Sequence, residues 1–220
     1  MRVAGANGFP PPPAWYRIAH PGPAAFLLPM HKGRLEAFSD GVIAIIITIM
    51  VLEMKVPHGT DFASLQPLLP VFLSYALSFL YVGIYWNNHH HLFQAVKHVK
   101  GPVLWANLHL LFWLSLFPFV TGWMGENHFA PVTVALYGGV LILAAVAYTI
   151  LVRCLLAYHE TDSALAKAIG SDAKGWASLA LYGLGIPLAC WWPWVAITLY
   201  AAVAVLWLVP DRRIEKVLAS

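Results

Sequence analysis

The sequence predicts an all-α membrane protein with six transmembrane helices, and three observations support that prediction. The 220-residue chain is 60% hydrophobic and only 10% charged, against ~25% charged residues in an average soluble domain. Its mean hydropathy is +0.69. Its apolar residues gather in long segments suited to the ~30 Å hydrocarbon layer, and several of its ten Trp residues lie at segment edges, as expected for interfacial belts.

Six apolar segments define the expected helices. They cover roughly residues 35–54, 68–90, 102–123, 131–157, 176–192 and 194–209. The last two are short, and Pro193 lies between them, so we expect a tight aromatic hairpin at the membrane interface. We expect three regions: a Pro-rich disordered extension over 1–30, the six-span domain over 31–210 and a cytoplasmic tail over 211–220.

The basic residues set the expected orientation. Twelve of the thirteen Lys and Arg residues fall on one side of the alternating topology, and Lys55 falls on the other. By the positive-inside bias, both termini face the cytoplasm. The basic residues lie in short loops and form no patch, so we expect no nucleic-acid partner. The sequence also lacks GxxxxGK[ST] and a soluble catalytic domain, so we expect neither ATP-driven transport nor an enzyme.

The first segment, RLEAFSDGVIAIIITIMVLEMK over residues 34–55, is the most informative part of the chain. Asp40 lies inside it, and a charged acid within a transmembrane helix is costly unless it has a partner. At ~100° per residue, one arc of about 100° collects a stripe of four residues: Ile45, Thr48, Ile49 and Leu52. Asp40 lies roughly 120–140° from the centre of that arc. The stripe faces either a pathway or lipid, because every face of this segment is apolar.

Polar side chains in the next two segments are candidates for a buried network. The second segment ends in Trp86-Asn87-Asn88-His89-His90-His91, and one of these histidines is placed to turn inward toward the acid. For His90 and His91, a polar helix end at the cytoplasmic interface is the simpler interpretation. Asn107 in the third segment either joins the network or makes an ordinary interhelical contact, since a buried amide needs partners.

These residues resemble the signature of the endosomal/lysosomal potassium channel family (transmembrane protein 175) and its bacterial homologues. The resemblance covers about residues 30–123 and rests on Arg34-x-x-x-Phe38-Ser39-Asp40, on Trp86-x-x-His89, and on Asn107-Leu108 with the later Pro118. It implies that the motif residues form a structural polar network around the first helix. With Asn107 added, that network comprises Arg34, Phe38, Ser39, Asp40, Trp86, His89 and Asn107.

The resemblance also implies a function. The family fold has six spans per repeat, a pore lined by the first helix of each repeat, and no carbonyl-lined filter. Because this chain carries one repeat, a homotetramer in a bacterial cytoplasmic membrane is implied, with K⁺ as the permeant ion and no cofactor. Ile45, Thr48, Ile49 and Leu52 would face the pore, with Ile45 at the family's constriction. We therefore expect a passive, weakly potassium-selective channel whose apolar rings stand in place of a carbonyl filter.

Two other classes of protein stay open. A proton-coupled transporter would use Asp40 and His89 as a relay, and a pore of the same architecture would also admit protons. A metal-dependent membrane enzyme would need several spaced histidine boxes on one membrane face. Only His89, His90, His91 and His98 cluster in the sequence, so we expect no metal site.

Overall fold

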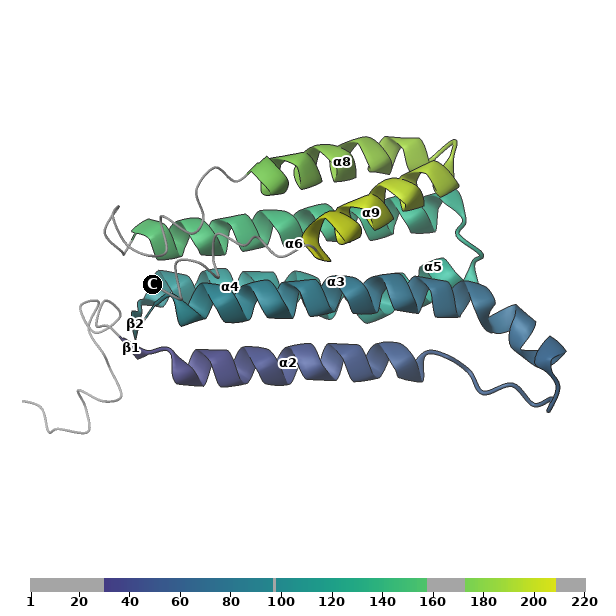
Figure 1. The fold of residues 1–220 in the computed structure, drawn as a ribbon, viewed down its shortest axis with the longest axis horizontal. Coiled ribbons are helices and arrows are strands. Elements are labelled where there is room, and N and C mark those ends of the chain that lie inside the picture. The colour runs from purple at the N-terminus through teal and green to yellow at the C-terminus, as the bar shows by residue number, and fades with distance from the viewer. Residues whose placement is uncertain (1–29, 97, 158–172, 209–220) are drawn as a thin grey trace, which may run out of the picture.

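The computed structural model describes residues 30–96, 98–157 and 173–208, and it is an elongated bundle of helices (Figure 1). In chain order the helices are α2 (Gly33–Leu52), α3 (Leu69–Gln94), α4 (Gly101–Ser115), α5 (Phe117–Glu126), α6 (Pro131–Ala157), α8 (Ala173–Ala189) and α9 (Pro193–Leu208). The short 3-10 helix η2 (Phe62–Leu68) leads into α3, and strand β1 (Met30–His31) pairs antiparallel with β2 (His98–Val99). The expected extension, apart from Met30, and the expected tail lie outside the described residues.

The helices bear out the all-α membrane class. Among the described residues, four stretches are long and apolar enough to cross a membrane: α2, η2 with α3, α4 with α5, and α6. Helices α8 and α9 are shorter, at 17 and 16 residues, and meet at a tight turn before Pro193. The count of six spans therefore stays a prediction.

The third expected span consists of two helices. Helix α4 ends at Ser115 and α5 begins at Phe117. Pro118 lies in the first turn of α5, since it has no N–H to donate to the carbonyl of Leu114 and its ring clashes with the preceding turn. Helix α4 then packs against α6, while α5 packs against α3. The hydroxyl of Thr121 in α5 lies 3.9 Å from the sulfur of Met50, so α5 also contacts α2.

Helix α2 lies along one edge of the bundle, and α8 lies along the opposite edge (Figure 1). Helix α2 packs on α3, α4 and α5, whereas α6 packs on α4, α5, α8 and α9. The side chains that α2 buries recur every three or four residues, which is the period of a single helix face. They are Leu35, Ser39, Ile43, Ile46 and Met50. Most of the other α2 side chains are partly or fully exposed within the part of the chain that the structure describes.

Helices α6, α8 and α9 approach closely around Tyr200. Its ring centroid lies 6.2 Å from that of Tyr137 and 6.1 Å from that of Tyr182. A Cβ atom added to Gly138 would lie 2.0 Å from the Tyr200 hydroxyl oxygen, and one added to Gly185 would lie 2.5 Å from a ring carbon. The two glycines therefore make room for a fully buried aromatic ring.

We predict that Gly138→Ala destabilises the bundle by about 1–3 kcal/mol, the usual cost of overpacking a close-packed core. Gly139→Ala is the matched control, because a Cβ atom there has no neighbour within 4 Å. Removing glycine from that helix interior should be neutral or stabilising by ~0.5–1 kcal/mol. Thermal unfolding of the purified protein in detergent measures both changes, and equal melting temperatures would contradict the close approach at Gly138.

Candidate functional site

A chain of hydrogen bonds joins α2, α3 and α4 in the interior of the bundle. The Nε2 atom of His89 lies 2.8 Å from Oδ1 of Asn107, and Nδ2 of Asn107 donates to Oγ of Ser39 at 2.9 Å. The Ser39 hydroxyl donates in turn to the carbonyl of Leu35 at 2.9 Å. All three polar side chains are at most 1% exposed. An amide oxygen only accepts, so His89 must donate from Nε2, and the chain runs in one direction.

The position of Ser39 explains why this chain forms. Ser39 lies four residues after Leu35 and four before Ile43, so it belongs to the buried face of α2. A hydroxyl buried there needs partners, and a mid-helix Ser commonly bonds to the carbonyl one turn back. The remaining acceptor capacity of Ser39 receives the Asn107 amide. The N-terminal half of α2 is thereby held to α4 in one rotational setting.

Asp40 makes a separate contact. Its carboxylate accepts a hydrogen bond from Nε1 of Trp86 at 3.1 Å, and both side chains are exposed in the isolated chain. The Trp86 indole stacks on His90, with ring centroids 5.9 Å apart. The interpretation in which a histidine turns inward to bond the acid therefore differs from the structure, because His89 bonds Asn107 instead. Asp40 lies too far around the helix from Ser39 to share its buried partners.

Arg34 and Phe38 lie outside both contacts. Both are exposed in the isolated chain, Phe38 by 55%. Within the described ranges Arg34 forms no ion pair, whereas the neighbouring Lys32 pairs with Glu36 at 3.4 Å and donates to the carbonyl of Phe93. The expected network thus divides into a buried group (Ser39, His89 and Asn107), an exposed pair (Asp40 and Trp86) and two outward-facing motif side chains (Arg34 and Phe38).

The four side chains of the apolar stripe are all exposed in the isolated chain. Ile45 is 58% exposed, Ile49 41% and Leu52 79%, and Thr48 is exposed as well. Ile47 lies on another face and packs partly against the core. The helical phase expected from the sequence therefore separates a packed face of α2 from an unpacked one.

Thr48 is the polar member of this stripe. Its hydroxyl donates to the carbonyl of Ile45 at 2.9 Å. The bond uses the hydroxyl proton and leaves the lone pairs of Oγ1 as acceptors on the exposed face. Oxygen lone pairs are the groups that replace water around a monovalent cation in a narrow pathway. The stripe can therefore offer one oxygen ligand per chain between apolar side chains.

Ion-pairing residues flank the other end of α2. Lys55 pairs with Glu126 at 2.9 Å, and this hydrogen bond raises the pKa of Lys55. Glu126 lies 71 residues further along the chain, so no local sequence signal identified it as the partner. Within residues 30–96, 98–157 and 173–208, no group of three His, Cys, Asp or Glu side chains is arranged to hold a metal ion.

Comparison with known proteins identifies the family. The sequence pattern of the family described as "Endosomal/lysosomal potassium channel TMEM175" matches residues 34–118. A potassium channel from Chryseobacterium sp. (strain P1-3) is 60% identical over 187 residues, which are 85% of this chain and 97% of the relative. The endosomal/lysosomal proton channel TMEM175 of Bos taurus is 38% identical over 87 residues, which are 34% of this chain and 18% of the relative.

A solved structure agrees with these relatives. The crystal structure of a lysosomal potassium-selective channel TMEM175 homolog from Chamaesiphon minutus matches with a TM-score of 0.72 and 29% identity. The match covers 81% of this chain and 96% of that chain. The fold and the apolar helices define a helical membrane protein of the ion-channel class. The chain belongs to the TMEM175 family, and the matched residues contain the whole buried hydrogen-bond chain.

We predict that Asn107→Leu destabilises the protein by ~1–3 kcal/mol, because the Nε2 donor of His89 loses its acceptor in a dry interior. Asn87→Leu is the matched control, since Asn87 lies on α3 and is exposed. The control should change the melting temperature little. Thermal unfolding in detergent tests both variants. An Asn107→Leu protein with an unchanged melting temperature would show that the buried hydrogen bonds do not hold α2 in place.

Proposed function

We propose that the chain is a passive, weakly potassium-selective channel of four identical copies, with α2 of each copy lining a central pore. The observation that carries the proposal is the unpacked stripe of Ile45, Thr48, Ile49 and Leu52 on a helix at the edge of the bundle. One helix cannot enclose a pathway, and a closed ring of identical copies is the usual symmetric solution. The Chamaesiphon homolog, described as a potassium-selective channel, shares the fold.

The position of Asp40 argues against lipid on the part of the α2 surface that carries this residue. It is the eighth residue of α2 and exposed, about 10 Å from the helix start at 1.5 Å per residue. A carboxylate facing hydrocarbon at that depth is costly. Next to another copy or to water in a pore entrance, the same carboxylate finds donors. We therefore propose that Arg34 and Asp40 hold the pore helix in place and that the apolar stripe lines the conduction pathway.

Two apolar rings would control conduction. Ile45 and Leu52 are seven residues apart on one face, which separates their rings by ~10 Å along the pore. Such rings are too narrow and too dry for a fully hydrated ion, so they resist wetting and make partial dehydration the selective step. Thr48 and Ile49 lie between them, and the Thr48 oxygen supports the ion there. Potassium holds its water less tightly than sodium, which favours potassium weakly.

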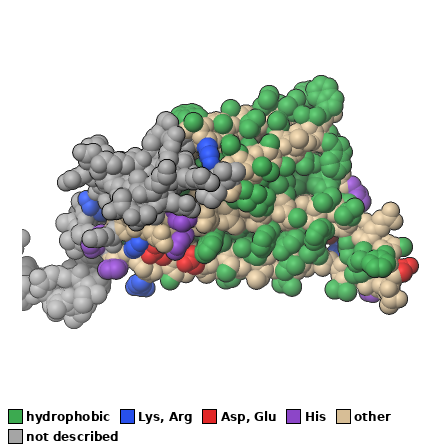
Figure 2. Space-filling model, in the orientation of Figure 1, with side chains coloured by type: hydrophobic (Ala, Val, Ile, Leu, Met, Phe, Trp, Pro, Cys, Tyr) green, Lys and Arg blue, Asp and Glu red, His purple; other side chains and the backbone are tan. Residues whose placement is uncertain are grey.

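The distribution of charge supports the orientation. Basic side chains gather at the end of the bundle that carries β1 and β2, and Figure 2 shows blue, red and purple side chains collected there beside a long apolar surface. Within the described ranges these basic residues are Lys32, Arg34, Lys100, Arg153 and Lys174, with Lys55 at the opposite end. We place the basic end, with both termini, in the cytoplasm of a bacterial cell, with α8 and α9 as short fifth and sixth spans.

A proton-permeable pore is the second candidate function. The bovine TMEM175 relative is described as a proton channel. The TMEM175 family pattern matches residues 34–118, which include most of α2. A proton-coupled transporter with Asp40 and His89 as a relay receives less support from the geometry. Asp40 bonds Trp86 and His89 bonds Asn107, so the two groups have separate partners.

We predict that the active unit is a tetramer. Native mass spectrometry in a mild detergent should give the mass of four copies of the 24.2 kDa chain, since a single α2 per chain cannot enclose a pore alone. A sample that is monomeric in detergent and still conducts ions as a monomer after reconstitution into bilayers would contradict the proposal.

The sharpest prediction concerns Ile45. In planar bilayers with potassium on one side and sodium on the other, Ile45→Asn should bring the reversal potential close to zero and raise the sodium current, because a polar ring wets easily. Ile47→Asn is the matched control, since Ile47 is partly buried on another face of the same helix. It should leave the reversal potential near that of the unmodified channel.

The same measurement distinguishes the candidates. If assembled Ile47→Asn tetramers change selectivity while Ile45→Asn tetramers do not, the proposed pore face is wrong. Adding a pH gradient separates proton from potassium conduction, because a proton-selective pore follows the proton equilibrium potential whatever the potassium gradient. Saturable uptake that depends on a pH gradient, without single-channel currents, would identify a transporter.

A further inference from the structure

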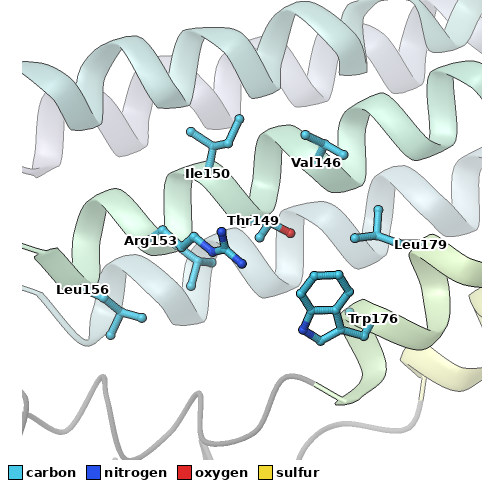
Figure 3. A pocket seen from close by; sticks show the side chains of 9 residues that line it. Val146, Thr149, Ile150, Arg153, Leu156, Trp176 and Leu179 are labelled. Atoms are coloured by element: carbon cyan, nitrogen blue, oxygen red, sulfur yellow. The ribbon is translucent and has the colours of Figure 1, made fainter.

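A groove lies between α6 and α8, near the end of the bundle where the basic residues gather (Figure 3). Its volume is about 340 Å³, at the small end of the ~300–1,000 Å³ typical of small-molecule sites. Apolar side chains make up most of its wall, including Val146, Ile150, Leu156 and Leu179. The groove is thus apolar enough, and large enough, to hold part of a hydrocarbon chain.

One charged side chain enters this apolar wall. Of the described residues that line the groove, Arg153 alone is charged, and it lies four residues before the end of α6. That position is ~6 Å inside the helix end at 1.5 Å per residue. Within the described part of the chain Arg153 forms no ion pair. A cation at that depth in a transmembrane helix calls for an anion nearby.

A second side chain that lines the groove, Trp176, suits the headgroup level of a bilayer. Figure 3 shows the Arg153 guanidinium beside Thr149, with the Trp176 indole across the groove. Trp176 is 65% exposed, and an exposed Trp near the end of a span is typical of the headgroup level of a bilayer. Thr149 donates its only hydroxyl proton to the carbonyl of Ala145, so Arg153 is left as the donor to a phosphate at this position.

We propose that this groove binds an anionic phospholipid, with the phosphate against Arg153 and an acyl chain along Val146, Ile150 and Leu179. Basic pockets between helices on the cytoplasmic side commonly bind acidic lipid headgroups. The groove adjoins α8, on the edge of the bundle opposite α2 (Figure 1). If α2 faces the pore axis, a placement that rests on the proposed function, the groove opens toward the surrounding bilayer.

A second copy of the chain is a poorer occupant. Helices α6, α8 and α9 contain no Asp or Glu, so the described helices on this side of another copy bring no carboxylate for Arg153. The acidic side chains that the described ranges do contain lie on α2, in the segment before η2 and at the end of α5. An acidic lipid supplies both the anion and the apolar chain that the groove lacks.

Native mass spectrometry of the full-length protein, incubated with phosphatidylglycerol or phosphatidylcholine at equal concentration, tests the charge. Phosphatidylglycerol should be retained preferentially. Arg153→Gln should reduce its retention about fivefold, which corresponds to ~1 kcal/mol for one basic residue at an anionic surface, and leave phosphatidylcholine unchanged. Lys174→Gln is the matched control, because it removes the same charge at the same end of the bundle. The Lys174 ammonium lies 5.9 Å from the Trp207 ring centroid and does not line the groove, so this variant should retain nearly as much phosphatidylglycerol as the unmodified protein.

A second pair of variants tests the apolar part. Leu179→Trp should fill the groove and reduce retention of phosphatidylglycerol, whereas Leu184→Trp, at a 53% exposed position of α8 outside the groove, should not. Equal losses from Arg153→Gln and Lys174→Gln would overturn the proposal, as would normal retention in Leu179→Trp. An altered oligomeric mass in Arg153→Gln without lipid loss would assign the groove to a second copy. None of these measurements depends on conduction, so lipid binding and the pore can fail separately.

Discussion

The placement of α2 depends on one buried amide. Helix α2 lies at an edge of the bundle and packs through a single face, so apolar contacts alone would allow it to rotate or slide at small cost. Asn107 removes that freedom, because it must accept from His89 and donate to Ser39 at once. A rotation of α2 breaks the Ser39 bond and leaves buried polar groups unpaired, which costs ~1–3 kcal/mol for each. The direction of the unpacked stripe follows from this fixed rotation.

Most of the fold was predictable because it depends on long apolar runs. The expected spans over 131–157 and 194–209 correspond closely to α6 (Pro131–Ala157) and α9 (Pro193–Leu208). The unpacked face of α2 was equally predictable, since a rotation of 100° per residue is enough to place Ile45 and Leu52 on the same face. The break at Leu116 was missed although Pro118 is visible in the sequence, because hydropathy does not register the loss of one backbone donor.

The polar contacts were less predictable. Ser39 and Asp40 are neighbours in the sequence motif. In the structure, however, Ser39 accepts a hydrogen bond from Asn107, whereas Asp40 accepts one from Trp86. Adjacent residues on a helix point about 100° apart, so a shared motif does not mean a shared partner. Lys55 and Glu126 are paired only because the end of α5 returns beside the end of α2. Such contacts depend on the packing of whole helices, which periodicity does not specify.

The interruption at Leu116 gives α2 two different supports. Its first half is tied through Ser39 to α4, before the interruption, and its second half contacts α5 through Met50 and the Lys55–Glu126 pair, after it. A change of angle between α4 and α5 would therefore pull on the two halves unequally. Ile45 lies between the two supports, and Leu52 lies beside the second. The joint at Leu116 thus gives a mechanical route by which the two ends of one straight helix can be adjusted separately.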